Sequence, residues 1–266
     1  EVLLWQAGRV ERVGALWSFP LPGGDQAVRQ PRRSALAVLY ELLGERAWNS
    51  FAPLRDWFSP MEQSGLRSML HRGVNCPRTT SMGRLFDAVA ALCGLGEQIS
   101  FEGQAAMALE FAALEEPGEP VHRLPGYPLP WIEGTEKSDL PEKIAGTSPE
   151  EKSLRFGLLD WRPMVEAVLK DRSVGVSVGQ ISRRFHAALV EGALKAAHWA
   201  AKQWGVRRIA LSGGCFQNAL LTQFAYQRLH QAGFTVYLHQ HVPPGDGGIA
   251  LGQILLAVAS SHLRQS

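Results

Sequence analysis

The sequence predicts an α/β domain, because strand and helix patterns alternate within Arg207–Gln253. That stretch opens with a short apolar run, Ile209–Leu211, which ends at the turn Ser212–Gly214. A polar turn then starts a helix with one apolar face, and a second strand, Phe234–Leu238, follows it. A last apolar helix begins at Asp246–Gly248. The order of elements is therefore βαβα, with a glycine turn before each helix.

The two glycine turns indicate a nucleotide site. Glycines let the backbone approach a phosphate, and N–H groups at a helix start attract anions. Asp246 could hold a metal ion through a hard oxygen ligand, or it could simply form an Asx-turn before two glycines. Cys215 directly follows the first turn, but no base lies near it in sequence, so we interpret it as a packing residue.

The N-terminal part predicts a β-hairpin followed by a helix. Val2–Trp5 and Val10–Phe19 are the expected hairpin strands. Asp25 is a candidate N-cap for a helix that continues to about Leu43, and Pro31 suggests that the regular part begins there. The arginines on this helix could form a solvated basic face.

Several shorter helices should follow. Trp48–Leu70 is aromatic and punctuated by proline, which favours short helices. The hydroxyls of Thr79–Ser81 can cap a helix over Met82–Leu92, and a further helix should run from Gly103 to about Leu114. Because Asp87 lies near the first helix start, it could be an ordinary surface carboxylate.

The centre of the chain is less regular. Residues 115–151 are rich in proline, glycine and charge, which indicates a surface insertion or loop with a short strand near Trp131. Leu158–Leu169 reads as helical, and Val178–Trp204 as a long amphipathic helix lying against the sheet. His186 on that helix is expected to form structural hydrogen bonds rather than to catalyse a reaction.

Composition limits the classes of function. The 266 residues carry a net charge of +2 with interspersed signs, which gives no case for nucleic-acid binding. No apolar run is long enough to span a membrane, and the N-terminus does not resemble a signal peptide. Three cysteines without metal spacing suit a reducing cytosol, so we expect a cytoplasmic protein. Because residue 1 is glutamate, an excised fragment or processed chain is also expected.

Four blocks of sequence resemble the HypF carbamoyltransferases, whose relatives include antibiotic O-carbamoyltransferases and TsaD threonylcarbamoyl transferases. They are LPGGDQAVRQPRRSAL at residues 21–36, TTSMGRLFDAVAAL at 79–92, FEGQAAMALE at 101–110, and SGGCFQNALL with VPPGDGGIALGQ between 212 and 253. The order of the blocks is also that of the family, whereas residues 112–178 match poorly. The resemblance implies that residues 1–266 are the C-terminal portion of an actin-like (ribonuclease H-like) ATPase-superfamily domain of the TsaD/HypF type, with helical insertions.

The resemblance also implies an activity and a site. HypF proteins use ATP and carbamoyl phosphate to make carbamoyl-adenylate, and pass the carbamoyl group to the C-terminal cysteine thiol of HypE for the cyanide ligand of NiFe hydrogenase. It assigns no catalytic residue here, but Asp246 matches a metal-binding aspartate, and Asn218 can read the adenine edge or a ribose hydroxyl. Asn218 could also simply be the N-cap of the helix that follows it, and both roles can coexist. Six residues match nucleotide-binding positions: Asp87, Gly103, Ser212, Gly213, Gly214 and Asn218.

The chain departs from the family in its histidines. HypF proteins hold the metal with two histidines four residues apart, and none of the eight histidines here has that spacing. We therefore expect a divalent metal (Fe, Zn or Mg) only when a complementary N-terminal half is present. The implied partners are that half and a HypE-like maturation protein. If the half is absent, the strand over Val10–Phe19 should expose an edge, and a homodimer could form through it.

Two other functions stay open from the sequence alone. The lost histidine pair favours a non-catalytic remnant that only binds a maturation partner. An actin-fold kinase for small molecules shares the predicted fold, but it would require a glycine-rich phosphate turn in a first lobe, which the sequence does not show.

Overall fold

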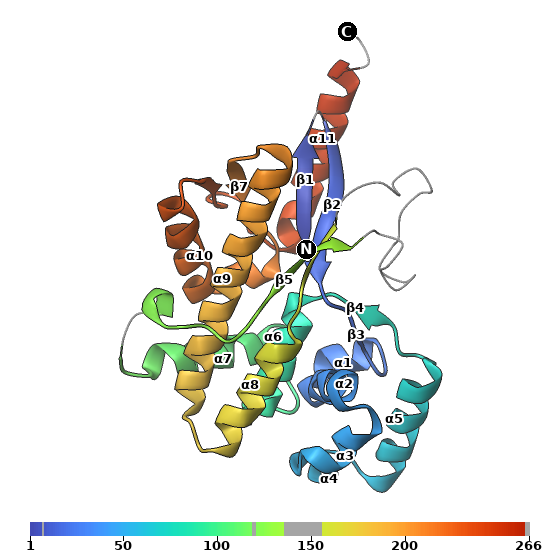
Figure 1. Ribbon diagram of the computed structural model, residues 1–266. Helices are drawn as coiled ribbons and strands as arrows, with labels where there is room; N and C mark the ends of the chain where they lie inside the picture. Colours follow the sequence, from blue (N-terminus) through green and yellow to red (C-terminus); the bar gives the residue numbers. More distant parts are fainter. Residues whose placement is uncertain (7, 119–120, 136–155, 264–266) are drawn as a thin grey trace.

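A computed structural model describes residues 1–6, 8–118, 121–135 and 156–263 (Figure 1). Its main sheet has four strands in the order β1-β2-β6-β5. Their bounds are Val2–Gln6 for β1, Arg9–Leu16 for β2, Trp131–Thr135 for β5 and Phe156–Leu159 for β6. β2 pairs antiparallel with β1 and parallel with β6, while β5 pairs antiparallel with β6. The predicted α/β class and the N-terminal hairpin are confirmed.

Two expectations about strands are wrong. The strand from Val10 was expected to expose a sheet edge, but β2 is paired on both sides, and among the described strands the edges are β1 and β5. Leu158–Leu169 was expected to be helical, but β6 includes Leu158 and Leu159, and α8 begins only at Arg162 (Arg162–Ser173). The apolar run of β6 is buried along its whole length, so a short central strand suits it better than a helix.

A tryptophan fixes one face of the main sheet. Gly14 and Gly157 are direct partners in the β2–β6 register, and the Trp131 ring lies across both of them. A Cβ on Gly157 would lie 1.9 Å from Cζ2 of Trp131, so only glycine admits the ring. Trp131 in turn contacts Trp199 of helix α9, with ring centroids 5.2 Å apart. This contact seats α9 (Val178–Trp204) on the sheet, as predicted.

Helix α9 is the central helix of the molecule and contacts several others (Figure 1). Its predicted bounds are confirmed: Ser177 caps its start by accepting from the Gln180 N–H, and Gly205 follows its end at a φ of 69°. The helices around it are α6 (Met82–Leu92), α7 (Gln104–Glu115), α8, and α10 (Ala219–Gln231). The predicted Met82–Leu92 helix and its Ser81 cap are also confirmed.

Residues 21–76 form a helical module beside α9 and the helices around it (Figure 1). Its helices are α1 (Asp25–Arg29), α2 (Pro31–Leu43), α3 (Ala47–Ser50), α4 (Pro53–Trp57) and α5 (Pro60–Arg72). A two-stranded pairing of β3 (Phe19–Pro20) with β4 (Arg78–Thr79) closes the module. Pro31 does begin the regular helix, but Asp25 is not an N-cap, because Gly24 occupies that position without a side-chain bond.

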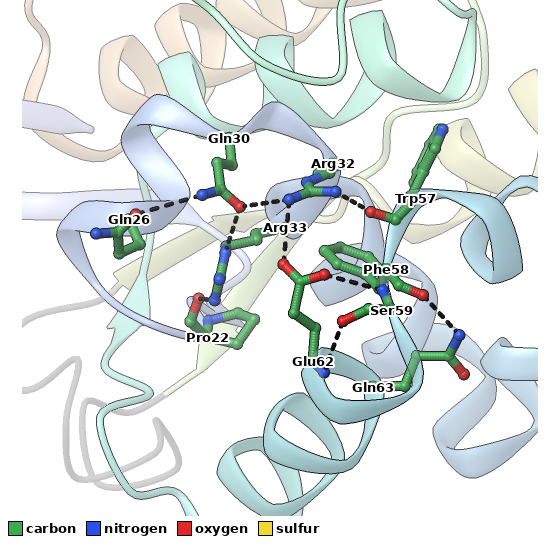
Figure 2. A network of polar contacts seen from close by, with 10 residues as sticks. All are labelled: Pro22, Gln26, Gln30, Arg32, Arg33, Trp57, Phe58, Ser59, Glu62 and Gln63. Carbon is green, nitrogen blue, oxygen red and sulfur yellow. Dashed lines mark hydrogen bonds and ion pairs between the residues drawn. The ribbon is translucent and has the colours of Figure 1, made fainter.

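The arginines at the start of α2 are not a solvated face. Arg32 donates to the Trp57 carbonyl, lies 3.3 Å from Glu62 Oε1, and stacks 4.7 Å from the Phe58 ring centroid (Figure 2). Glu62 also completes a capping box with Ser59 at the start of α5. Arg32 therefore ties α2 to the corner between α4 and α5.

The predicted βαβα unit is present at the C-terminal end. β7 (Arg208–Ala210) and β8 (Thr235–Tyr237) pair in parallel as a separate two-stranded sheet, with α10 between them in sequence. Helix α11 (Ile249–Leu263) follows. The segment 115–151 contributes strand β5 and, in its described part, the buried side chains of Val121, Tyr127 and Leu129. Its residues 119–120 and 136–151 lie outside the described part.

Candidate nucleotide site

The first glycine turn leaves strand β7 at an exposed position. Ser212, Gly213 and Gly214 are all exposed, and the 3-10 helix η5 (Gly214–Gln217) follows. Gly213 has φ 100° and ψ 161°, a conformation that essentially only glycine adopts. Its N–H donates to the Pro244 carbonyl at 2.8 Å. Among the described residues the Gly214 N–H has no acceptor, so one donor of the turn is available to a ligand.

The second glycine turn lies against the first. A Cβ at Gly245 would lie 2.7 Å from Nε2 of Gln217 and 3.9 Å from the Gly214 Cα. Asp246 is exposed at the start of the 3-10 helix η6 (Asp246–Gly248). The βαβα unit thus brings its two turns together at the carboxyl ends of parallel strands, where α/β sheets usually bind ligands.

Asn218 is buried and both of its amide atoms are engaged. Oδ1 accepts from the Leu221 N–H at 2.7 Å and so caps α10, while Nδ2 lies 3.0 Å from His186 Nε2. The predicted capping role of Asn218 is confirmed. Its contact with a nucleotide stays a prediction: Nδ2 has a second N–H, and Oδ1 a second lone pair, that these two bonds do not use.

His186 has the structural role that the sequence predicts. It is fully buried, and its Nδ1 lies 2.8 Å from the Ser182 carbonyl. Since Nδ1 donates there, Nε2 is the acceptor for the Asn218 amide. Burial lowers the pKa of His186 to about 4, so the imidazole is neutral at physiological pH. These hydrogen bonds, from Ser182 through His186 to Asn218, link α9 to the start of α10.

Helix α6 places a buried ion pair behind the first turn. Arg84 Nη2 lies 3.0 Å from Asp87 Oδ2, and Asp87 is only 1% exposed, so it is not the surface carboxylate that was considered. Within the described residues, neither Arg84 Nη1 nor Asp87 Oδ2 makes a hydrogen bond, so the contact between Nη2 and Oδ2 is an ion pair without hydrogen-bond geometry. Burial raises the pKa of the Cys215 thiol, while the charge of Arg84 lowers that pKa and the charge of Asp87 raises it. The Arg84–Asp87 pair therefore lies beside η5, which contains Cys215. Cys215 is thus no activated nucleophile.

Burial also raises the pKa of Asp87 from 3.8 to about 6; Arg84 opposes this shift and Glu102 adds to it. Between those pH values the folded chain retains a proton that the unfolded chain releases, so this group makes stability fall as pH rises. His186 acts in the opposite direction, because its lowered pKa makes stability fall as pH decreases below about 6.5.

Comparison with Asp87→Asn should isolate the effect of Asp87. Measured by urea unfolding, the difference in unfolding free energy (variant minus parent) should increase by about 2 kcal/mol from pH 4 to pH 7, because the unfolded carboxyl is already more than half ionised at pH 4. The constant cost of leaving Arg84 unpaired cancels from this change. A difference that does not vary with pH would show that Asp87 has an ordinary pKa.

The sequence-predicted residues are only partly brought together. Ser212, Gly213, Gly214 and Asn218 surround η5, and Asp87 lies behind it. Gly103 is the N-cap of α7 with φ 83°, and α7 reaches this region through Glu110, whose Oε1 accepts from the Leu220 N–H at 3.1 Å. Sequence reasoning missed Glu110 and Gln217, and it gave His239 no role at the nucleotide site. The contact of His239 depends on the register of β7 and β8, which is seen in the structure and not in one sequence.

The described residues do not complete a metal site. Asp246 is exposed, and no cluster of three or more His, Cys, Asp or Glu side chains occurs among residues with described positions. Protein metal sites of this kind typically require about three ligands. The residues here therefore do not fit a resident metal by themselves.

The architecture and the paired glycine turns define a Kae1-like domain. Residues 1–253 match the family model described as "Carbamoyltransferase, Kae1-like Domain, second subdomain". The chain belongs to the HypF carbamoyltransferase family, which confirms both the resemblance and the predicted fold.

Known relatives are similar along almost the whole chain. Carbamoyltransferase HypF2 of Cupriavidus necator is 39% identical over 97% of the chain and 31% of its own length. Carbamoyltransferase HypF of Synechocystis sp. is 33% identical over 97% of the chain and 31% of its own length. A crystal structure of full-length HypF in the phosphate- and nucleotide-bound form superposes with a TM-score of 0.79 at 29% identity, covering 97% of this chain and 30% of that one.

The chain spans less than a third of the length of these relatives. In the part that the structure describes, no helix is long and apolar enough to cross a membrane.

Proposed function

We propose that the chain supplies the nucleotide-binding part of a carbamoyltransferase site in NiFe hydrogenase maturation. In that reaction the carbamoyl group of carbamoyl-adenylate passes to the C-terminal cysteine thiol of a HypE-like protein. The observation that carries the proposal is the exposed Ser212–Gly214 turn, with its free Gly214 N–H, in a member of the HypF family.

The residues around the turn would hold the nucleotide of ATP or carbamoyl-adenylate. The Gly214 N–H and the Ser212 hydroxyl can donate to phosphate oxygens at the open end of β7. Behind them, the buried Arg84–Asp87 pair of α6 places two opposite charges beside η5. Holding the AMP leaving group in place favours transfer, because bound and oriented reactants pay less entropy in the transition state.

Metal chemistry would require ligands beyond those described here. Asp246 could contribute one hard oxygen ligand to a divalent ion, with the remaining ligands coming from a complementary N-terminal half. We assign no step to such an ion.

The turn can be tested by titrating ATP by calorimetry into the parent chain and into Gly213→Ala. Alanine rarely adopts the φ of 100° and ψ of 161° found at Gly213, and doing so would cost roughly 1–3 kcal/mol. The turn should therefore change its conformation, and ATP affinity should fall by about 10-fold or more.

Gly205→Ala is the matched control, because Gly205 also has positive φ, at 69°, but it follows α9 and precedes β7, whereas the turn follows β7. It should lower the free energy of unfolding without changing ATP affinity. An equal loss of affinity in both variants, or a parent chain that does not bind ATP, would contradict the proposal.

A further inference from the structure

Ser212 and His239 meet where the two parallel strands end. In the β7–β8 register, Arg208, Ile209 and Ala210 pair with Thr235, Val236 and Tyr237. The Leu211 N–H continues the ladder by donating to the Tyr237 carbonyl at 3.0 Å. The next step of the same register places Ser212 beside His239, and His239 Nε2 lies 2.9 Å from Ser212 Oγ.

This contact decides where the Ser212 hydroxyl points. Among the described residues its hydrogen has two possible acceptors, the His239 Nε2 atom at 2.9 Å and the Pro244 carbonyl at 3.5 Å. If Nε2 is the acceptor, the hydroxyl hydrogen is directed into the imidazole and away from the turn. If His239 carries its proton on Nε2, it donates to Oγ instead, and the hydroxyl hydrogen becomes free to donate elsewhere.

The free hydroxyl would lie at the anion-facing side of the turn. Ser212 and His239 are both exposed, and the unused Gly214 N–H belongs to the same turn. A phosphate oxygen offers only acceptors, so it favours the arrangement in which both the hydroxyl and the N–H donate to it.

We propose that His239 is a positioning residue that turns the Ser212 hydroxyl toward a phosphate oxygen of a nucleotide bound at this turn. The proposal rests on the proposed nucleotide binding and extends it to a residue that none of the family blocks assigned to the nucleotide. The neutral Nε2–H tautomer is sufficient for the role, and no net charge on His239 is required. The ligand class is a nucleoside phosphate, and the nucleoside itself is not recognised by this pair.

The test compares ATP with adenosine by calorimetry at one pH. His239→Ala should weaken ATP binding by about 10- to 100-fold, the effect of one hydrogen bond to a charged group, and leave adenosine binding unchanged. His239→Gln should recover part of the ATP affinity, because its amide can donate to Ser212 Oγ. Ser212→Ala should lose as much as His239→Ala, and the double variant should lose no more. His241→Ala, a nearby exposed histidine, should bind ATP like the parent.

The hydrogen bond can also be observed without a ligand. With nitrogen-15 labelling at histidine, the Nε2 resonance of His239 should differ between the parent chain and Ser212→Ala, whereas that of His241 should be the same in both. Because His239 is exposed, its variants should fold, and circular dichroism checks this.

Two kinds of result would overturn the inference. Unchanged ATP affinity in His239→Ala, an equal loss for adenosine, or an unshifted His239 resonance would contradict the role of His239 alone. If the parent chain does not bind ATP, the nucleotide site itself is wrong and this inference fails with it.

Discussion

Asn218→Ala is expected to lower the free energy of unfolding by about 2–4 kcal/mol, more than the loss of a helix cap alone. The variant removes the oxygen that accepts from the Leu221 N–H at the start of α10. It also removes the donor to His186 Nε2, which would remain buried without a partner. Urea unfolding at pH 7 measures the change.

Two other variants separate these contributions. Ser81→Ala removes the cap of α6, whose hydroxyl accepts from the Arg84 N–H at 3.4 Å, without affecting a buried histidine; it should cost about 1 kcal/mol. Asn218→Asp keeps the cap oxygen but removes the donor, and it should show an intermediate loss at pH 7. If Asn218→Ala cost no more than Ser81→Ala, the contact with His186 would contribute nothing to stability.

The sequence predicted those parts of the fold that depend on local chemistry. The bounds of α9 follow from Ser177 at its start and Gly205 after its end, both of which act within one helical turn. The Ser212–Gly214 turn was predictable for the same reason, because the backbone at Gly213 requires glycine. The Asn218 cap belongs to this group as well.

Features that depend on tertiary packing were not predictable in this way. Strand β6 has only four residues before Asp160, so its apolar run could not be distinguished from the first turn of α8. Asp87 looked exposed because it lies near a helix start, but α6 is covered by neighbouring elements on all sides of that position. The contact between Ser212 and His239 depends on the register of two strands, which one sequence does not reveal.

The surface of the chain indicates where the rest of a carbamoyltransferase domain would dock. The outer face of the hairpin exposes Leu3, Trp5 and Val10, and Trp5 is 72% exposed. Helix α11 exposes apolar side chains around much of its circumference: Ile249, Leu251, Ile254 and Leu255. In Figure 1, α11 extends away from the other helices. A helix that is apolar all round is normally buried.

We therefore propose that the remaining part of the domain covers α11 and this hairpin face. The matching family model describes a second subdomain, and the chain covers about a third or less of the full-length relatives. Trp5→Ser and Ile254→Ser should each weaken binding of the complementary fragment by about 10-fold, which corresponds to losing the burial of one large apolar side chain. Phe111→Ser, at a side chain of α7 that is 53% exposed, is the control and should not affect binding.

Carbamoyl transfer is expected to be absent from the isolated chain and to return when the complementary fragment is added. The physical reason is that this chain offers an exposed glycine turn and the exposed Asp246, whereas polarising the carbamoyl carbonyl requires further donors or a complete metal site. The measurement is the mass of a HypE-type acceptor together with release of AMP, with and without the fragment. Gly213→Ala in the reconstituted pair should reduce transfer, while Gly205→Ala should not.

Full transfer by the chain alone would refute the division of the site. Binding of the acceptor without transfer, even after reconstitution, would favour a partner-binding remnant, and a stable dimer that excludes the fragment would show that a second copy covers α11.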